Sequence, residues 1–361
     1  MFLRNQWYVA AFDDELGRTP LARTVLGEEL ILFRRLDGGA VALENRCAHR
    51  RLPLSAGRLV GDTIECGYHG LVYDCGGRCI KIPGQVHGPE APVVRAYPVV
   101  ERHRFVYVWI GDAELADPAR IVSFPRLSDP ASGVTKVRLH VPANHLLILD
   151  NLLDLSHIAY VHNSTIGNAA VAEQAEVKTR RIGQHVRVTR EMNGVPAPST
   201  YAQFGPHQGI FDRWQLSEFR PPGYFWINNG SAACGWRSAD GGDRIETQGE
   251  WGFEVYHGIT PETATTTHQF WTLAHALDMV RPDDRAEFYR QCHHVVYEDL
   301  AVYEAQQRSL DTDPAGASAD AVGSRIAIEA DRALLQGRQV LKELMRANHP
   351  TQPPIPHEAR P

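Results

Sequence analysis

Two short pairs of cysteine and histidine lie close together in the first fifth of the chain. Cys47 and His49 form a Cys-x-His pair, and Cys66 and His69 form a Cys-x-x-His pair. Two thiolates and two imidazoles are the ligand set of a Rieske [2Fe–2S] cluster, in which the cysteines hold one iron and the histidines hold the other. Imidazole is neutral where thiolate is negative, so such a cluster has a raised reduction potential. The spacing therefore predicts an electron-transfer cluster with four ligands: Cys47, His49, Cys66 and His69.

A second cysteine pair offers a rival ligand set. Cys75 and Cys79 lie in a glycine-rich hairpin turn that follows the first two cysteines. They could serve as cluster ligands, but the histidine pairing accounts for the first two cysteines without them. Disulfides are not expected in a long cytosolic chain. The other interpretation is that the remaining cysteines are small buried hydrophobes, namely Cys75, Cys79, Cys234 and Cys292.

Residues that could bind a second metal follow near the middle of the chain. The stretch 144–160 has helical spacing, and Asp154 and His157 would share one face of this helix because they are three residues apart. An acid in that position could orient the histidine of a metal site. His162 lies five residues further on, about 140° round a regular helix. Both histidines can therefore bind one metal only if the helix ends or bulges between them, and the run 163–167 supplies such an ending.

Two histidines leave a metal short of a ligand, and the long helix predicted near the C-terminus offers a carboxylate. Asp299 lies in the apolar stripe of that helix, where a charge is costly unless it is paired or bound to metal. Glu298 points about 100° away and is the weaker candidate. His157, His162 and Asp299 would form a two-histidine, one-carboxylate triad, the arrangement of non-haem Fe(II) oxygenases.

Each residue of this second group also has a structural interpretation. Histidines in apolar helices are commonly structural, and His293 and His294 are interpreted in that way. Asp299 alone could be a salt-bridge partner within its helix. The combination is harder to explain as structural, because a Rieske cluster needs a site that accepts its electrons.

The elements around these residues divide the chain into two unlike parts. Short apolar strands between glycine turns predict a small β domain over residues 1–115, and the region 116–349 mixes helices with strands. The proline-rich tail 350–361 is expected to be loosely ordered. The predicted strands are 22–26, 29–34, 40–44, 105–110, 186–189, 224–227 and 266–271, and the predicted helices are 144–160, 285–308 and 324–346.

Composition and charge argue against several classes of protein. The 361 residues are 43% hydrophobic and 22% charged, which is typical of a soluble globular protein with two domains. A net charge of −6 gives no reason to expect nucleic acid or an anionic membrane as a partner. No apolar run approaches the ~18 residues of a membrane helix, and the start lacks the pattern of a signal peptide, so we expect a cytoplasmic protein.

Motifs for binding a nucleotide are missing from the sequence. There is no Gly-x-Gly-x-x-Gly run and no Gly-Lys pair of the phosphate-loop kind. Reduced nicotinamide or flavin is therefore expected to bind a different protein.

Together, the motifs resemble the oxygenase component of the Rieske non-haem iron aromatic oxygenases. The resemblance extends from the run 5–10 to about Gln307. Within that family the chain is most similar to the short, single-subunit-type group of vanillate O-demethylase, dicamba O-demethylase and toluenesulfonate methyl-monooxygenase. Further shared runs are Lys-Ile-Pro-Gly-Gln at 81–85, Asp-Arg-Trp-Gln at 212–215 and Glu-Asp at 298–299.

The resemblance implies a fold and an assembly. The fold is α+β: an N-terminal all-β Rieske [2Fe–2S] domain and a C-terminal helix-grip catalytic domain, whose curved antiparallel sheet surrounds a long helix. The family assembles as a head-to-tail homotrimer, in which the cluster of one subunit faces the mononuclear Fe(II) of the next. Asp154 would then bridge His69 of the neighbour and His157, and Asn151 would lie beside the iron without being a firm ligand. Electrons would come from a separate flavin and ferredoxin-type reductase that uses NADH.

The resemblance also implies residues for substrate binding. In the dicamba enzyme an asparagine and a histidine hold the substrate carboxylate, and Asn229 and His257 occupy the matching positions. The chain departs from its relatives at Asn144-His145-Leu146, where they often carry an aromatic residue followed by Lys or Arg. His145 could therefore face the pocket or be structural.

These features together predict a terminal oxygenase of a multicomponent monooxygenase. It would use O2 for the O-demethylation or methyl hydroxylation of a small, vanillate-like aromatic acid. One alternative is the α subunit of a ring-hydroxylating dioxygenase, although those chains are usually longer. Another is a non-catalytic Rieske electron carrier, although a carrier needs only about a hundred residues.

Overall fold

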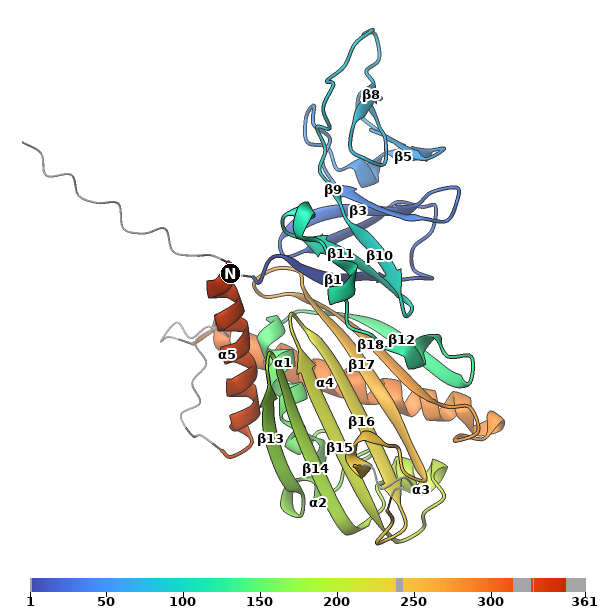
Figure 1. Ribbon diagram of the computed structural model, residues 1–361, viewed down its shortest axis with the longest axis vertical. Coiled ribbons are helices and arrows are strands. Elements are labelled where there is room, and N and C mark those ends of the chain that lie inside the picture. Colours follow the sequence, from blue (N-terminus) through green and yellow to red (C-terminus); the bar gives the residue numbers. More distant parts are fainter. Residues whose placement is uncertain (1, 238–242, 314–325, 327, 349–361) are drawn as a thin grey trace, which may run out of the picture.

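The computed structural model describes residues 2–237, 243–313, 326 and 328–348. Figure 1 shows a small β domain stacked on a larger domain of sheet and helices, with the N-terminus near their junction. This architecture confirms the predicted α+β class. The proline-rich tail predicted at 350–361 lies outside the described residues.

Three small sheets build the β domain, with strand orders β1-β11-β10, β2-β3-β4-β9 and β5-β6-β7-β8. The four strands predicted here are present within a residue of the expected bounds. The strands are β1 (Gln6–Phe12), β2 (Leu21–Val25), β3 (Glu28–Arg34), β4 (Ala40–Glu44), β5 (Arg58–Val60), β6 (Thr63–Glu65), β7 (Val72–Tyr73), β8 (Cys79–Lys81), β9 (Ala96–Tyr97), β10 (Val99–Arg102) and β11 (Phe105–Ile110).

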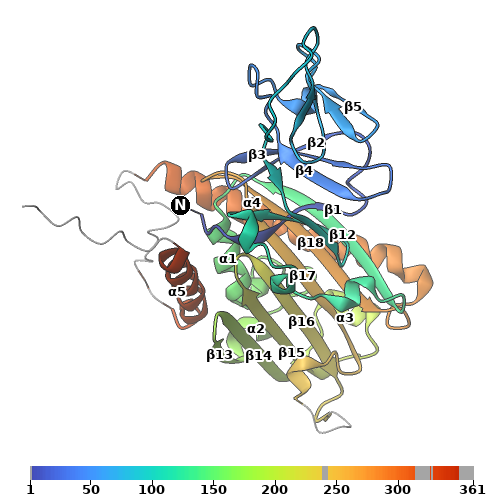
Figure 2. The ribbon, with the colours of Figure 1, turned by 45° about the horizontal axis from the view of Figure 1, so that its top comes forward.

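The larger domain is built on one seven-stranded antiparallel sheet, in the order β12-β18-β17-β16-β15-β14-β13. Figure 2 shows the long helix α4 crossing one face of this sheet, which is the arrangement implied by the family resemblance. The strands are β12 (Ser132–Val141), β13 (Glu176–Ile182), β14 (His185–Pro196), β15 (Ile210–Arg220), β16 (Tyr224–Ala232), β17 (Trp251–Pro261) and β18 (Thr267–Ala276). The helices are α1 (His145–Leu153), α2 (Ala170–Glu173), α3 (Ser199–Phe204), α4 (Arg285–Asp311) and α5 (Asp331–Asn348).

Two helix predictions are wrong in their bounds. The helix predicted over 144–160 ends at Leu153, and a separate 3₁₀ helix η5 (Leu155–Ala159) follows it. Asp154 makes the break: its backbone is extended, and its carboxylate accepts the N–H of Ser156 at 2.9 Å, so it caps the next turn. The last helix begins at Asp331, after a non-helical stretch at 328–330, and the Asp331 carboxylate accepts the N–H of Ile328 just before it. The start predicted at residue 324 lies outside the described residues.

The two domains share one apolar cluster, so the β domain is held firmly on the back of the large sheet. Trp7 and Tyr107 of the β domain pack with Tyr224 and Phe270 of the large domain. The Tyr224 hydroxyl also donates to the Trp7 carbonyl at 2.6 Å across this contact. Strand β1 therefore contributes to the interface between the domains as well as to its own sheet.

A buried ion pair fixes α5 against α1, the helix that leads into the predicted metal site. Arg338 Nε lies 2.8 Å from Asp150 Oδ1, and a second contact joins the other guanidinium and carboxylate atoms. Gly337 is also in close contact with this helix, because a Cβ there would lie 2.6 Å from Leu153. The side chain of Arg338 is 7% exposed and that of Asp150 is 20% exposed.

We expect Arg338→Met to lower the free energy of unfolding by about 2–3 kcal/mol, because it leaves the largely buried Asp150 carboxylate without its cation. The urea midpoint, followed by far-UV circular dichroism, measures the loss. The double variant Asp150→Leu with Arg338→Met removes both charges and should regain most of the stability. A single variant as stable as the unchanged protein would show that the pair contributes nothing.

Candidate metal and substrate sites

The four predicted cluster residues lie on two loops at the tip of the β domain. Cys47 is in the loop between β4 and β5, and Cys66 is in the loop between β6 and β7. Each cysteine is 2% exposed, whereas His49 and His69 are both exposed. The two imidazole rings are 4.6 Å apart between centroids. The arrangement places two thiols inside and two imidazoles at the surface, where electrons can enter or leave.

Matching backbone contacts shape these two loops. The N–H of Cys47 donates to the Leu52 carbonyl at 2.9 Å, and the N–H of Cys66 donates to the Leu71 carbonyl at 2.8 Å. The Tyr73 hydroxyl lies 3.1 Å from Cys47 Sγ. Tyr73 is fully buried, so it supports the sulfur from within the domain.

The remaining cysteines differ from one another in their surroundings. Cys75 donates to the Asp62 carbonyl at 3.0 Å, and Cys79 lies 3.7 Å from the Lys81 carbonyl. Cys79 and Cys292 are buried as expected, whereas Cys75 is half-buried. The prediction is wrong for Cys234, which is exposed beyond the end of β16.

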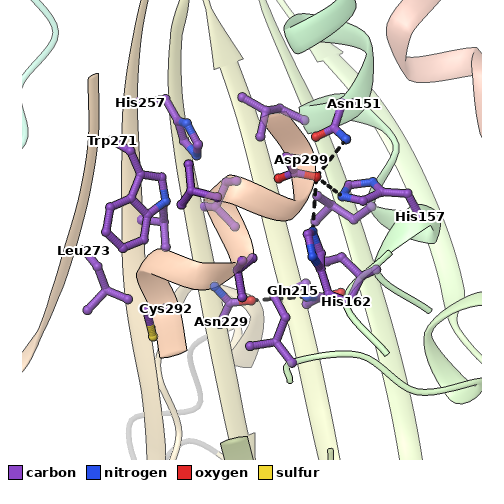
Figure 3. Close-up of a pocket in the computed structure, with 18 of the residues that line it drawn as sticks. Asn151, His157, His162, Gln215, Asn229, His257, Trp271, Leu273, Cys292 and Asp299 are labelled. Atoms are coloured by element: carbon purple, nitrogen blue, oxygen red, sulfur yellow. Dashed lines mark hydrogen bonds and ion pairs between the residues drawn. The ribbon is translucent and has the colours of Figure 1, made fainter. Parts of the chain in front are cut away.

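The second predicted ligand set comes together between α4 and the turns that follow α1 (Figure 3). Asp299 Oδ1 lies 3.5 Å from His157 Nε2 and 3.2 Å from His162 Nε2. One donor atom from each of the three residues lies within 4.8 Å of the other two. Among the residues that the structure describes, no other group of three His, Cys, Asp or Glu side chains is gathered in this way. Two imidazoles and a carboxylate fit a non-haem Fe(II) ion, so the donor set suits the predicted metal.

Burial and neighbouring charges shift the pKa values of the two histidines in opposite directions. Burial lowers the pKa of His157, which keeps its imidazole neutral. Burial also acts to lower the pKa of His162, but the carboxylates of Asp299 and Glu298 outweigh it and raise that pKa. A metal ion bound by His162 would therefore take the place of a proton.

Neighbouring groups fix the orientation of the His157 and Asp299 side chains. His157 Nδ1 donates to the backbone carbonyl of Asp154 at 2.6 Å, and Asn151 Nδ2 donates to Asp299 Oδ1 at 3.2 Å. The Tyr303 hydroxyl in turn donates to Asn151 Oδ1 at 3.0 Å. Asn151 therefore lies beside the triad and holds its carboxylate, which is consistent with its expected place.

Within one chain, Asp154 contacts His157 through its backbone carbonyl. Its carboxylate caps η5 and lies 3.1 Å from Arg190 Nη2. The carboxylate that does orient a histidine is Glu298, whose Oε2 lies 2.8 Å from His162 Nδ1. Sequence reasoning set Glu298 aside as a ligand. Its offset of about 100° from Asp299 round the helix points it away from the metal and toward Nδ1 of His162, the ring nitrogen that does not face Asp299.

A cavity of about 620 Å³, counting its open mouth, lies next to the triad. Its polar side chains apart from the triad are Asn151, Gln215, Asn229 and His257. The apolar wall is formed by Leu152, Leu155, Ile158, Ile166, Ile227, Phe253, Val255, Trp271, Leu273, Cys292, Val295 and Val296.

Asn229 and His257 both line this cavity, but they lie at different ends of it. The register of β16 and β17 pairs His257 with Phe225 and Asn229 with Phe253. Four residues along an antiparallel strand correspond to about 13 Å. Figure 3 shows Gln215 beside Asn229 in one part of the pocket and Trp271 beside His257 in another. Their joint hold on one substrate carboxylate stays a prediction.

The other histidines that drew notice in the sequence lie outside this cavity. His145 packs against Phe2, with 5.9 Å between ring centroids, in a separate hollow near Met345. His293 Nε2 lies 2.8 Å from Thr135 Oγ1 and so connects α4 to β12. Both have structural surroundings.

Comparisons with known proteins match both halves of this arrangement. A family model of the Rieske [2Fe–2S] domain matches residues 6–98, and one of the vanillate O-demethylase oxygenase C-terminal domain matches residues 141–347. The toluene-4-sulfonate monooxygenase system iron-sulfur subunit of Comamonas testosteroni is 36% identical over 97% of this chain and 99% of its own. A vanillate O-demethylase oxygenase subunit of Pseudomonas sp. (strain HR199 / DSM 7063) is 36% identical over 86% of this chain and 87% of its own.

A solved structure resembles nearly the whole chain. Dicamba monooxygenase bound to 3,6-dichlorosalicylic acid superimposes with a TM-score of 0.86 at 30% sequence identity. The match covers 96% of this chain and 98% of that one. The two-domain arrangement is therefore shared with a protein whose related structures include one with non-haem iron.

We expect Glu298→Ala to weaken Fe(II) binding by about 10- to 100-fold, because His162 loses the carboxylate that fixes its ring. Competition with a coloured chelator measures the affinity, and the visible spectrum of the cluster shows that the β domain is intact. Glu298→Gln keeps an accepting oxygen and should retain most of the affinity. His294→Ala is a matched control, since His294 is an exposed neighbour 3.5 Å from Glu298. Equal iron affinity in the Glu298→Ala and His294→Ala variants would contradict the role of Glu298.

Proposed function

The chain belongs to the Rieske non-haem iron oxygenases, in the group of vanillate O-demethylase oxygenase subunits, and on this premise we propose that it oxidises a methyl or methoxy group of a small aromatic acid. It is an oxygenase component, and its cofactors are a Rieske [2Fe–2S] cluster and a mononuclear iron. The observation that carries the proposal is the contact of the triad His157, His162 and Asp299 with a mostly apolar cavity.

The ligand assignments follow from the donor sets. Cys47, His49, Cys66 and His69 hold the cluster, and His157, His162 and Asp299 hold the iron. When bound, the iron supplies the activation of O2 for attack on a C–H bond. We divide the chain at 115/116, between the ranges that the two family models match.

The residues of this chain position the metal ligands and the substrate, and they exclude water from the site. Asn151 and Glu298 keep the ligand side chains aimed at one point. The apolar wall, which includes Trp271 and Phe253, removes water from around the ring of a bound substrate. The polar side chains at its ends then orient that ring relative to the triad.

The balanced reaction uses one O2, NADH and a proton. One oxygen atom is inserted into a C–H bond of the methyl group, and the other leaves as water with the two electrons from NADH. When the group is a methoxy group, the resulting hemiacetal breaks its bond to the methyl carbon and gives a phenol and formaldehyde. The named activities of the relatives, a toluene-sulfonate monooxygenase system and a vanillate O-demethylase, support both outcomes.

Electrons reach the iron from the cluster of a neighbouring subunit in a homotrimer. Figure 1 supports this route, because the cluster loops beside β5 and β8 lie at the far end of the β domain from α1 and α4. Tyr68, next to His69, and Tyr160, close to His157, are 58% and 69% exposed, which suits a contact between subunits. Asp154 lies between His69 of the neighbour and His157 in this assembly. Sedimentation of the native protein should show a species of three chains.

The electron source is a separate flavin and ferredoxin-type reductase that uses NADH. Several relatives are named as oxygenase components or as subunits of a system, which supports a separate reductase. No helix in the described part of the chain is long and apolar enough to cross a membrane. We place the system in the cytoplasm, where NADH is available.

We expect Asp299→Ala to lose the mononuclear iron and all formaldehyde release from methoxybenzoates, because two imidazoles alone bind Fe(II) weakly. The cluster should keep its visible spectrum, since its ligands lie in the other domain. Iron analysis with a surrogate reductase assay measures both properties. Asp311→Ala, an exposed carboxylate at the end of the same helix, is the control and should retain both. Full turnover by Asp299→Ala would refute the iron assignment.

A further inference from the structure

Arg190 is a buried cation that joins the large sheet to the turn before His157. It lies on β14, and the residue is 3% exposed. Its Nη2 lies 3.1 Å from Asp154 Oδ1, and its Nη1 donates to the Val171 carbonyl of α2 at 3.2 Å. A guanidinium stays charged when it is buried, so it needs an anion nearby. Among the described residues, Asp154 is the only carboxylate in contact with it.

Stability alone does not account for this ion pair. Apolar side chains of similar volume often replace a buried ion pair without any loss of stability. The surroundings would suit such side chains, because Val171 lies in a buried apolar cluster with Ile158 and Met192. The pair is therefore better explained by the carboxylate that Arg190 holds in place.

The two carboxylate oxygens of Asp154 differ in their contacts. Oδ1 accepts the N–H of Ser156 at 2.9 Å as well as the Arg190 guanidinium. Oδ2 accepts no hydrogen bond from the described residues, and the side chain is 19% exposed. One oxygen is therefore held from two directions, which restricts rotation of the side chain and leaves the other oxygen unoccupied.

The main chain of Asp154 contacts the iron site. Its carbonyl accepts the Nδ1–H of His157 at 2.6 Å. In the proposed homotrimer, His69 of the neighbour approaches the carboxylate, so each electron that leaves the neighbour's cluster crosses this one residue. We propose that Arg190 is a positioning residue for this transfer, because it holds the Asp154 carboxylate in the orientation that meets the neighbouring imidazole. This inference rests on the proposed function and adds the residue that controls its entry of electrons.

The test follows the cluster in the native assembly. The reduced holoenzyme, freed of reductant, is mixed with O2 and 4-hydroxy-3-methoxybenzoate, and the visible spectrum gives the rate of cluster oxidation. Arg190→Met removes the guanidinium and should lower this rate by about 10- to 100-fold, as for other groups that orient a metal site. Iron content and the spectrum of the resting cluster should be retained, because Arg190 makes no polar contact with a metal ligand. Arg190→Lys keeps a cation that can reach Asp154 and should recover part of the rate.

The matched control is Arg23 in the β domain. It is also a buried arginine that binds one carboxylate, of Glu15, and one backbone carbonyl, of Ala10. The side chains of Arg23 and Arg190 are 5% and 4% exposed. Arg23→Met should therefore lower the urea midpoint to a similar extent, yet leave the rate of cluster oxidation unchanged.

Hydrogen exchange reports the orientation of Asp154 in protein without iron. The Ser156 amide is bonded to Asp154 Oδ1, so its exchange depends on how firmly that carboxylate is held. It should exchange faster in Arg190→Met and at the unchanged rate in Arg23→Met. Arg190→Lys should give intermediate rates in both measurements, which keeps the test decisive if Arg190→Met folds poorly.

Cluster oxidation at the unchanged rate in both Arg190 variants would overturn the inference, as would an equal loss in Arg190→Met and Arg23→Met. Its failure is distinct from that of the proposed function. Unchanged formaldehyde release by Arg190→Met supports the proposed function and refutes the role of Arg190. Iron-dependent cluster oxidation that slows in Arg190→Met supports the inference even if no methoxybenzoate releases formaldehyde.

Discussion

A buried carboxylate between one buried and one half-buried imidazole is the constraint on which the large domain depends. Asp299 is 7% exposed on the inward face of a 27-residue helix, among Cys292, Val296 and Tyr303. A charge in that place is costly unless a cation compensates it. His157, His162 and the metal they would share provide that compensation. The domain can be understood as a framework that brings these residues together from helix α4 and the turns that follow α1.

The geometry of the main chain near Asp154 allows His157 and His162 to point at the same site. A regular helix through 144–162 would point His157 and His162 in directions about 140° apart. The helix instead ends at Leu153, and Asp154 caps the short turn that follows it. Behind this break, α1 is held by the ion pair from α5 and by the hydroxyl of Ser217, which donates to the Leu152 carbonyl at 2.7 Å. The histidines thus lie on an irregular segment that rigid elements support on both sides.

The residue types in the sequence were enough to predict the metal ligands. Contacts that depend on how neighbouring strands pair could not be predicted from it. The cysteine and histidine pairs and Asp299 could be found because thiolate, imidazole and an acid in an apolar stripe have few alternative uses. Glu298 was set aside because its helical offset excludes it as a ligand, although the offset directs it at His162. The separation of Asn229 from His257 follows from the pairing of β16 with β17, and no local pattern in one strand encodes that pairing. The hydrogen bond from Gln215 to Asn229 has the same origin, since the two residues are cross-strand neighbours.

The central claim is that electrons stored in the cluster are used for oxidation at the triad. The most direct measurement is a single turnover, in which the holoenzyme is reduced, freed of reductant and mixed with O2 and 4-hydroxy-3-methoxybenzoate. The visible spectrum reports the cluster, and formaldehyde reports the product. The account predicts that the cluster is oxidised at the same rate as formaldehyde forms, and that protein without mononuclear iron does neither. A cluster that stays reduced while formaldehyde forms, or that is oxidised equally fast without the iron, would contradict it.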